Sequence, residues 1–149
     1  MARVLPAKAF LVGALLTALA DDEMITEVRF PPLLPGSGWD FKEFAQRTGD
    51  FAIAAVAVIL GVRDGRVTQA RLALMGVGET AVRASEAEAL LLGERYRPPL
   101  ASAAAASARA AISPHSDLRA SADYRRHLAG VLVEQALAAA FARTQRGAT

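Results

Sequence analysis

The segment Ser113–Asp117 holds the residue types of a hydrolytic triad, with Ser113, His115, Ser116 and Asp117 inside five consecutive positions. A triad needs a nucleophile, a base and an orienting carboxylate that converge on one centre, and these groups usually come from separated segments. Side chains this close in sequence rarely point at a common atom. We therefore expect no catalytic role for this cluster.

Metal and thiol chemistry have few candidate residues. The 149-residue chain has no cysteine and two histidines, His115 and His127. This composition excludes disulfides, thiolate metal sites, a cysteine nucleophile and iron–sulfur ligation by this chain, and it fits a reducing compartment. His127 lies beside Arg125 and Arg126, so a solvated polar stripe is the favoured interpretation of that segment.

One polar segment combines groups that suit ligand contact. Arg47, Thr48, Gly49 and Asp50 supply a cation, a hydroxyl, a flexible backbone and a carboxylate between two predicted strands. Backbone N–H groups in such a connection are free to meet a ligand. From spacing alone, an ordinary turn in which Asp50 caps the next segment is favoured over a binding loop.

Composition limits the classes of partner. A chain of this length predicts one domain with a single core. The 17 Lys and Arg are spread along the chain against 15 Asp and Glu, so the net charge is +2. No basic block predicts nucleic-acid binding, and no apolar run approaches the ~20 residues of a membrane helix.

The N-terminal segment 7–23 has the features of a secretory signal. Arg3 and Lys8 supply positive charge, an apolar run follows, and Ala18-Leu19-Ala20 fits the small-x-small cleavage pattern. One hypothesis is therefore a small exported α+β protein. The alternative is that these residues belong to the mature fold.

Two segments predict the first strands. Residues 24–30 alternate apolar and polar side chains closely enough to indicate a half-buried strand. Residues 39–46 alternate again, with Trp39, Phe41 and Phe44 as the expected buried members and an irregularity between the last two.

A hairpin is the strongest local prediction. Residues 52–62 and 66–77 are joined through Asp64-Gly65, a pair that tolerates the positive φ angles of a type I′ turn. The first strand is apolar on both faces and is predicted to be central. The second should present Ala70, Leu72 and Leu74 on one face.

Three helices are predicted after Val82. The segment 85–92 begins with acidic residues and is followed by Gly93, and a second helix over 100–112 follows Pro98-Pro99. The alanines expected to allow close packing of the second helix are Ala104, Ala105, Ala108 and Ala111.

The last helix should run from Ser121, as its N-cap, to about Arg143. Its predicted core face is Tyr124, Leu128, Val131, Leu132, Gln135 and Ala139. The resulting fold class is α+β, with a three- to four-stranded antiparallel sheet followed by and packed against three helices.

Three long segments carry a resemblance. They are FLVGALLTALADDEMITEVRFP, GWDFKEFAQRTGDFAIAAVAVILGVRDGRVTQARLALMGVGETAVRASEAEALLLG and SDLRASADYRRHLAGVLVEQAL. In this order and spacing they resemble the C-terminal domain of the FAD-binding (medium) subunit of molybdenum hydroxylases, a family that includes carbon monoxide dehydrogenase and xanthine dehydrogenase. The family has a similar FLVGALLTAL-like segment in its mature protein, so the resemblance implies that the signal-like start is a mimic.

The resemblance implies a cytoplasmic oxidoreductase part that is not catalytic alone. In the family, a molybdenum cofactor in a large subunit oxidises the substrate, two [2Fe-2S] clusters relay electrons, and FAD in the medium subunit passes them to an acceptor. The implied partners are an FAD-binding domain or chain, the molybdopterin large subunit and the iron–sulfur small subunit. Without the FAD-binding partner, the chain should bind FAD weakly or not at all.

The resemblance also implies domain bounds and flavin-contacting positions. Residues 1–22 would connect from a missing FAD-binding domain, 23–145 would form the C-terminal domain, and 146–149 a flexible tail. Several relatives carry a flavin-contacting lysine where this chain has Ala45, so a noncatalytic module of the same fold that has lost flavin binding is the alternative. The implied cofactor-binding residues are Ile25, Ala45, Gln46, Arg47, Thr48, Gly49 and Asp50.

The motif Tyr124-Arg125-Arg126-His127 has two interpretations. It could brace the domain against its FAD-binding neighbour or another subunit. The favoured interpretation is that Tyr124 anchors the core while the arginines cap the helix and are solvated.

Overall fold

The computed structural model describes residues 2–146, so the predicted tail 146–149 lies outside the described residues except for Arg146. Contacts divide the chain into two compact units, Met1–Leu33 and Leu34–Thr149. Each unit is described separately below. None of the helices within the described range combines the length and apolar composition needed to cross a bilayer.

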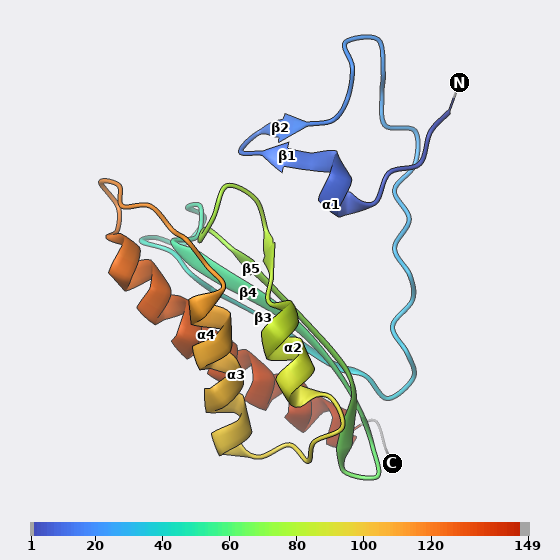
Figure 1. Ribbon diagram of the computed structural model, residues 1–149, viewed down its shortest axis with the longest axis vertical. Helices are drawn as coiled ribbons and strands as arrows, with labels where there is room; N and C mark the ends of the chain where they lie inside the picture. The colour runs from blue at the N-terminus through green and yellow to red at the C-terminus, as the bar shows by residue number, and fades with distance from the viewer. Residues whose placement is uncertain (1, 147–149) are drawn as a thin grey trace. The chain divides into compact units, whose positions relative to one another are not determined.

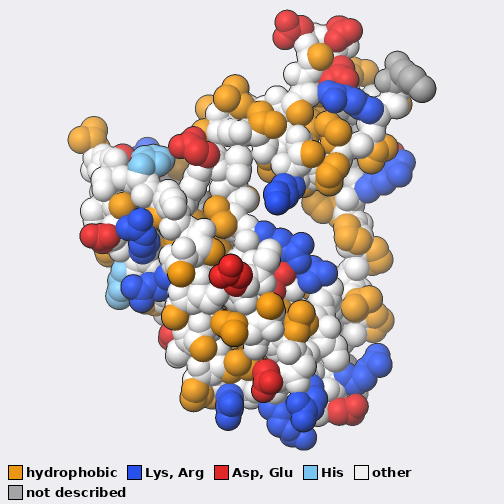
Figure 2. All heavy atoms as spheres, in the orientation of Figure 1, with side chains coloured by type: hydrophobic (Ala, Val, Ile, Leu, Met, Phe, Trp, Pro, Cys, Tyr) orange, Lys and Arg blue, Asp and Glu red, His pale blue; other side chains and the backbone are white. Residues whose placement is uncertain are grey.

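The unit Met1–Leu33 contains α1 (Ala7–Phe10), β1 (Leu11–Gly13) and β2 (Leu16–Thr17), the two strands forming a small antiparallel sheet. Arg3 ties this unit together, since its guanidinium donates to both carboxylate oxygens of Glu23 at 2.7 and 2.6 Å and to the Ala18 carbonyl at 2.6 Å. Many of the unit's hydrophobic side chains lie at its surface (Figure 2).

The unit Leu34–Thr149 is built on a four-stranded antiparallel sheet in the order β3-β4-β5-β6. Its long strands are β3 (Gly38–Phe44), β4 (Ala54–Arg63) and β5 (Arg66–Met75), and β6 (Val82–Arg83) is short. The predicted hairpin is confirmed, because Asp64 and Gly65 join β4 and β5 with φ angles of 53° and 74°. The prediction that β4 is central and that alternate residues of β5 are buried is also confirmed.

Three helices cover one face of this sheet (Figure 1). They are α2 (Ser85–Leu91), α3 (Pro98–Ala110) and α4 (Ala122–Arg146). Helix α4 packs against β3 and β4, α2 packs against β5, and α3 contacts both of the other helices. The predicted α+β class is therefore confirmed.

The core lies between the sheet and the helices. Alanine dominates the helix side, so α3 and α4 approach each other and the sheet closely. The largest fully buried side chains of the core are Leu60, Leu72, Leu74, Leu91, Leu137, Val56, Val58, Val67, Val77 and Val133.

The strand predicted at residues 24–30 is wrong for the described structure, which places no strand between Thr17 and Gly38. Ile25 is 53% exposed, and Met24, Val28 and Phe30 are more exposed still. An alternating pattern becomes a strand only when a neighbouring strand accepts and donates its backbone hydrogen bonds. Within the described residues, this segment has no such neighbour.

The predicted burial of Trp39 and Phe41 is also wrong, although β3 itself is present. Gly38 and Asp40 face α4 instead, and a side chain at Gly38 would lie 1.9 Å from the Ala140 carbonyl oxygen. Because strand side chains alternate, Trp39 and Phe41 then lie on the opposite, uncovered face.

The sequence pattern predicts that Phe44 is buried after an irregularity in the strand. It is 40% exposed, and the β3–β4 register is regular throughout. Side chains alternate along a strand, so Phe44, four residues after Asp40, lies on the same helix-facing side. No irregularity is needed to place it there.

The helix faces differ from prediction in several positions. Ala111 follows the end of α3 and is exposed, while Ile112 is buried. In α4, Leu128 and Leu132 are buried as predicted, whereas Tyr124, Val131, Gln135 and Ala139 are exposed or half-buried. A different set of α4 side chains forms the buried face, and it consists of Ala129, Val133, Ala136, Leu137 and Ala140.

Candidate functional site

The connection between β3 and β4 is a closed loop, residues 45–53. The Ile53 N–H donates to the Phe44 carbonyl at 2.7 Å and closes the loop, and the Asp50 N–H donates to the Arg47 carbonyl at 3.1 Å inside it. Gly49 adopts a φ of +90°, which favours glycine. The loop is therefore turned at its tip and fixed at its base.

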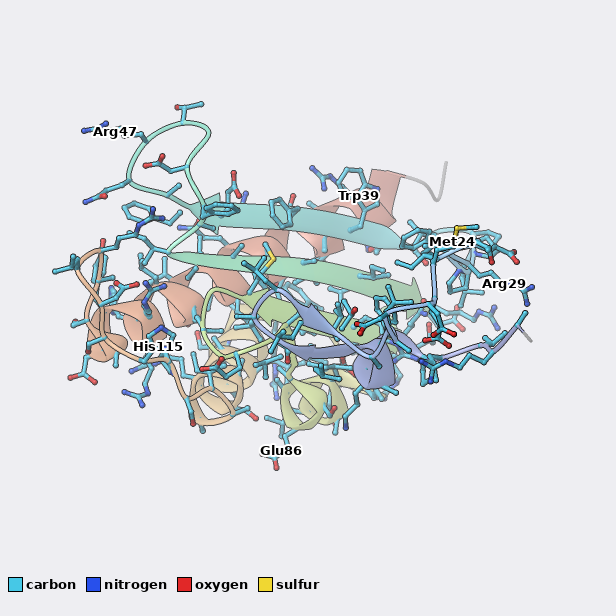
Figure 3. All side chains as sticks on the ribbon, turned by 90° about the horizontal axis from the view of Figure 1, so that it is seen from above. Met24, Arg29, Trp39, Arg47, Glu86 and His115 are labelled. Atoms are coloured by element: carbon cyan, nitrogen blue, oxygen red, sulfur yellow. The ribbon has the colours of Figure 1, made fainter. Side chains whose placement is uncertain are left out.

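The tip of this loop is exposed to solvent and carries hydrogen-bond donors that are available to a ligand. Figure 3 shows the labelled Arg47 pointing outward from the tip, and Gln46 to Asp50 are all exposed. Within the described part of the chain, the N–H groups of residues 46–49 have no protein acceptor. These N–H groups, the Thr48 hydroxyl and the Arg47 guanidinium are hydrogen-bond donors that a ligand could meet.

The sequence-predicted site residues fall into two groups. Gln46, Arg47, Thr48, Gly49 and Asp50 form the exposed tip, and Ala45 lies half-buried next to β3. Ile25 belongs to the other unit, Met1–Leu33, where its side chain is exposed.

A buried arginine, Arg125, lies at the base of the loop. Its guanidinium Nη1 donates to the carbonyls of Ile53 and Gly76 at 2.7 and 2.9 Å, and Nη2 donates to Asp117 Oδ2 at 2.7 Å. Arg125 is 7% exposed, so the favoured sequence interpretation, in which this arginine was solvated, is wrong.

Tyr124 holds the other end of the loop. Its ring packs edge-on against Phe44, with the ring centroids 6.3 Å apart and the planes at 85°. Tyr124 is 41% exposed, so it is not the core anchor that was predicted. Its backbone N–H donates to Ser121 Oγ at 3.2 Å, which confirms Ser121 as the N-cap of α4.

Asp117 has a structural role, because its carboxylate accepts hydrogen bonds that hold the α3–α4 connection. Its Oδ1 accepts the N–H groups of Arg119 and Ala120, both at 2.9 Å. These backbone bonds, together with the bond from Arg125, lower the pKa of Asp117 to about 2. Ser116 Oγ accepts the Ala122 N–H at 2.9 Å. The residues that suggested a triad therefore include two that organise the α3–α4 connection.

A second charged cluster fastens α2 to the sheet. The buried Glu88 carboxylate accepts from Arg83 Nη2 at 2.6 Å and from the Leu72 N–H at 2.9 Å. Burial alone would raise the pKa of Glu88, but these hydrogen bonds outweigh it and hold the pKa below its ordinary value. This cluster is structural, since it joins α2 to β5 and β6.

The face of the sheet opposite the helices carries an apolar patch on β3 and β4. Cross-strand pairing aligns Trp39 with Ile59 and Phe41 with Ala57. Trp39 is 51% exposed, and its ring lies under the Arg143 guanidinium, 4.4 Å from the ring centroid. Arg143 also pairs with the buried Asp40 at 2.9 Å, which joins α4 to β3. Aromatic surface of this kind is typical of contact with other protein.

The described residues offer no metal centre. Between residues 2 and 146, no three His, Asp or Glu side chains gather as ligands for an ion. In the unit Leu34–Thr149, the groups available to a ligand or partner are therefore the hydrogen-bond donors of the loop and the apolar side chains on the sheet.

The sequence matches a known protein family. The CO dehydrogenase flavoprotein C-terminal domain family matches residues 39–140. Among curated relatives, the carbon monoxide dehydrogenase medium chain of Hydrogenophaga pseudoflava is 38% identical over 141 residues, which are 95% of this chain and 49% of that one. The nicotine 6-hydroxylase medium subunit of Paenarthrobacter nicotinovorans is 37% identical, with 95% and 50% covered.

Solved structures agree with the sequence comparison. A carbon monoxide dehydrogenase from Hydrogenophaga pseudoflava matches with a TM-score of 0.91 and 41% identity, covering 95% of this chain and 49% of that one. Quinoline 2-oxidoreductase from Pseudomonas putida 86 matches with a TM-score of 0.87 and 34% identity, covering 95% and 50%. The chain thus spans about half the length of the relatives that it matches.

Proposed function

Because this chain belongs to the CO dehydrogenase flavoprotein C-terminal domain family, we propose that it covers the flavin in the FAD-containing subunit of a molybdenum hydroxylase. FAD, held mainly by the rest of that subunit, would take electrons from [2Fe-2S] clusters and pass them to an acceptor. The proposed partners are an FAD-binding domain or chain, an iron–sulfur small subunit and a molybdopterin large subunit. The proposed compartment is the cytoplasm.

The open loop tip is the observation that carries this proposal. The isoalloxazine ring system bears carbonyl and ring-nitrogen acceptors. Residues 46–49 present N–H groups that find no acceptor among residues 2–146. Arg47 adds an exposed cation beside them, which would compensate for the absence of a lysine at Ala45. The residues present therefore fit a flavin edge. Their role would be to orient the ring and to limit its contact with water.

Uncovered apolar segments support an FAD-binding neighbour. The outer sheet face around Trp39 and Phe41 is one such surface, and the extended segment 24–30 is another. We propose that Ile25, in this extended segment, contacts the flavin ring once a neighbouring strand supplies its hydrogen bonds. The boundary between a connecting segment, 1–22, and the domain, 23–145, stays a prediction.

A chimera tests the proposal. The FAD-binding half of the Hydrogenophaga pseudoflava medium chain would be fused ahead of this chain in place of the half that matches. After gel filtration, the folded chimera should retain FAD, measured by its visible absorption, while this chain alone should retain little. A folded chimera without FAD would contradict the proposal, provided that the parent medium chain retains FAD under the same conditions.

Ala45 favours one alternative function, a noncatalytic module that has lost flavin binding. The substitution Ala45→Lys in the chimera distinguishes the two. If FAD is retained only after this substitution, the chain is such a module. Equal FAD content with and without it would support the flavin role and assign the positive charge to another residue, such as Arg47.

A further inference from the structure

We infer that Arg125 is a positioning residue of the β3–β4 loop, which it fixes at its base so that residues 46–50 keep one arrangement. This inference rests on the proposed function, in which that arrangement faces the flavin. Arg125 itself is buried behind the loop and would not touch the cofactor.

The guanidinium joins three separate parts of the chain. Nη1 bridges the carbonyls of Ile53, at the end of the loop, and Gly76, just after β5. Nη2 reaches Asp117 in the α3–α4 connection. A planar guanidinium can serve these acceptors together from two separate nitrogens, whereas a lysine ammonium carries its three N–H donors on one nitrogen.

Gly76 makes this bridge possible. It adopts a φ of +76°, and a Cβ there would lie 2.8 Å from the Ile53 carbonyl oxygen and 3.0 Å from that of Ala52. Only glycine lets the end of β5 come this close to the loop without displacing backbone. The two carbonyls are thus brought within reach of one nitrogen.

Adjacent residues of α4 hold both ends of the loop. Tyr124 packs on Phe44, the residue before the loop, and Arg125 binds Ile53, its last residue. Ile53 and Phe44 are in turn joined by the 2.7 Å bond that closes the loop. The first turn of α4 therefore sets the base, and the exposed tip stays available to a ligand.

Removing the guanidinium should release the base of the loop. The Ile53 and Gly76 carbonyls would lose a charged donor in a buried place, which favours local opening of the loop over the closed state. The Ile53 N–H reports this opening because its exchange with solvent requires the bond to Phe44 to break.

Amide hydrogen exchange by NMR on the full chain tests the inference. Arg125→Met should accelerate exchange at Ile53 about tenfold relative to Val67, whose N–H donates to Glu94 at the far end of the sheet. Arg125→Lys should restore part of the protection. Arg126→Met is the surface control, and Val58→Ala, which truncates a buried side chain in the middle of β4, is the control for general destabilisation. Both should leave the Ile53 to Val67 ratio unchanged.

Two outcomes would overturn the inference. One is an unchanged ratio in Arg125→Met, and the other is an equal change of the ratio in Val58→Ala. Retention of FAD by the chimera is then measured with and without Arg125→Met. Faster exchange at Ile53 with full FAD retention would support the positioning role while removing the loop from the flavin site, so the two proposals fail separately.

Discussion

The two ends of β4 connect to their neighbours in opposite ways. At one end, Asp64 and Gly65 make a two-residue turn whose positive φ angles are all that the connection requires. At the other end, the loop 45–53 depends on Arg125, which is 72 positions from Ile53. One connection is determined locally and the other by the tertiary fold.

This difference distinguishes a connection that only supports the fold from one that forms the candidate site. The short turn exposes few groups and serves the hairpin, whereas the longer loop exposes donors while distant residues hold its base. Binding loops often combine a rigid base with an open tip. The comparison predicts that changes at the loop base affect stability, changes at the turn stay local, and changes at the tip affect binding.

The largest effect is expected at the loop base. Gly76→Ala should lower the free energy of unfolding by about 3 kcal/mol, because it combines positive-φ strain with a clash against backbone carbonyls. Gly93→Ala is a matched control, since Gly93 has a φ of +80° but an added Cβ would meet no atom of the described residues within 4 Å. Denaturant titration of both variants would contradict this account if the losses were equal.

The turn should show a smaller effect. Gly65→Ala should cost about 1 kcal/mol through strain at positive φ, since the nearest atom to the added Cβ belongs to the flexible Arg95 side chain. Exchange of the Ile53 N–H relative to other core amides should not change. Selective loosening of the loop in this variant would break the proposed separation between the two ends of β4.

Acid should weaken the loop base selectively. The folded pKa of Asp117, about 2, lies below its ordinary value of 3.8, so its ionised form contributes stability above that ordinary value. This contribution should be lost as the pH falls through about 2. The difference in unfolding free energy between the wild type and Asp117→Asn should therefore shrink from pH 4 to pH 2. Asp123→Asn, at the exposed surface pair with Arg126, is the control.

The smallest stability effect is expected at the tip. Arg47→Gln should change the free energy of unfolding by less than about 0.5 kcal/mol, because Arg47 is exposed. FAD retention by the chimera should nevertheless fall. A variant with full FAD retention would remove Arg47 from the proposed site, and Arg63→Gln, another exposed arginine, controls for loss of charge.

Sequence reasoning failed where burial depends on distant partners. The alternation around Trp39 identified two faces of β3 but not the one that α4 would cover, which is decided by the close approach of Gly38 to Ala140. Arg125 looked like a solvated helix residue, because its acceptors at Ile53 and Gly76 are remote in sequence. The pattern at 24–30 was insufficient because a strand also needs an edge to pair with.

The sequence alone determined the β4–β5 hairpin, the three helices, the N-cap at Ser121 and, through family resemblance, the candidate loop. These features follow from local φ preferences, capping groups and apolar periodicity, which neighbouring residues carry. Only the tertiary structure decided which face of β3 is covered and that Arg125 joins Ile53, Gly76 and Asp117. Such contacts depend on segments brought together by packing, so no local pattern could reveal them.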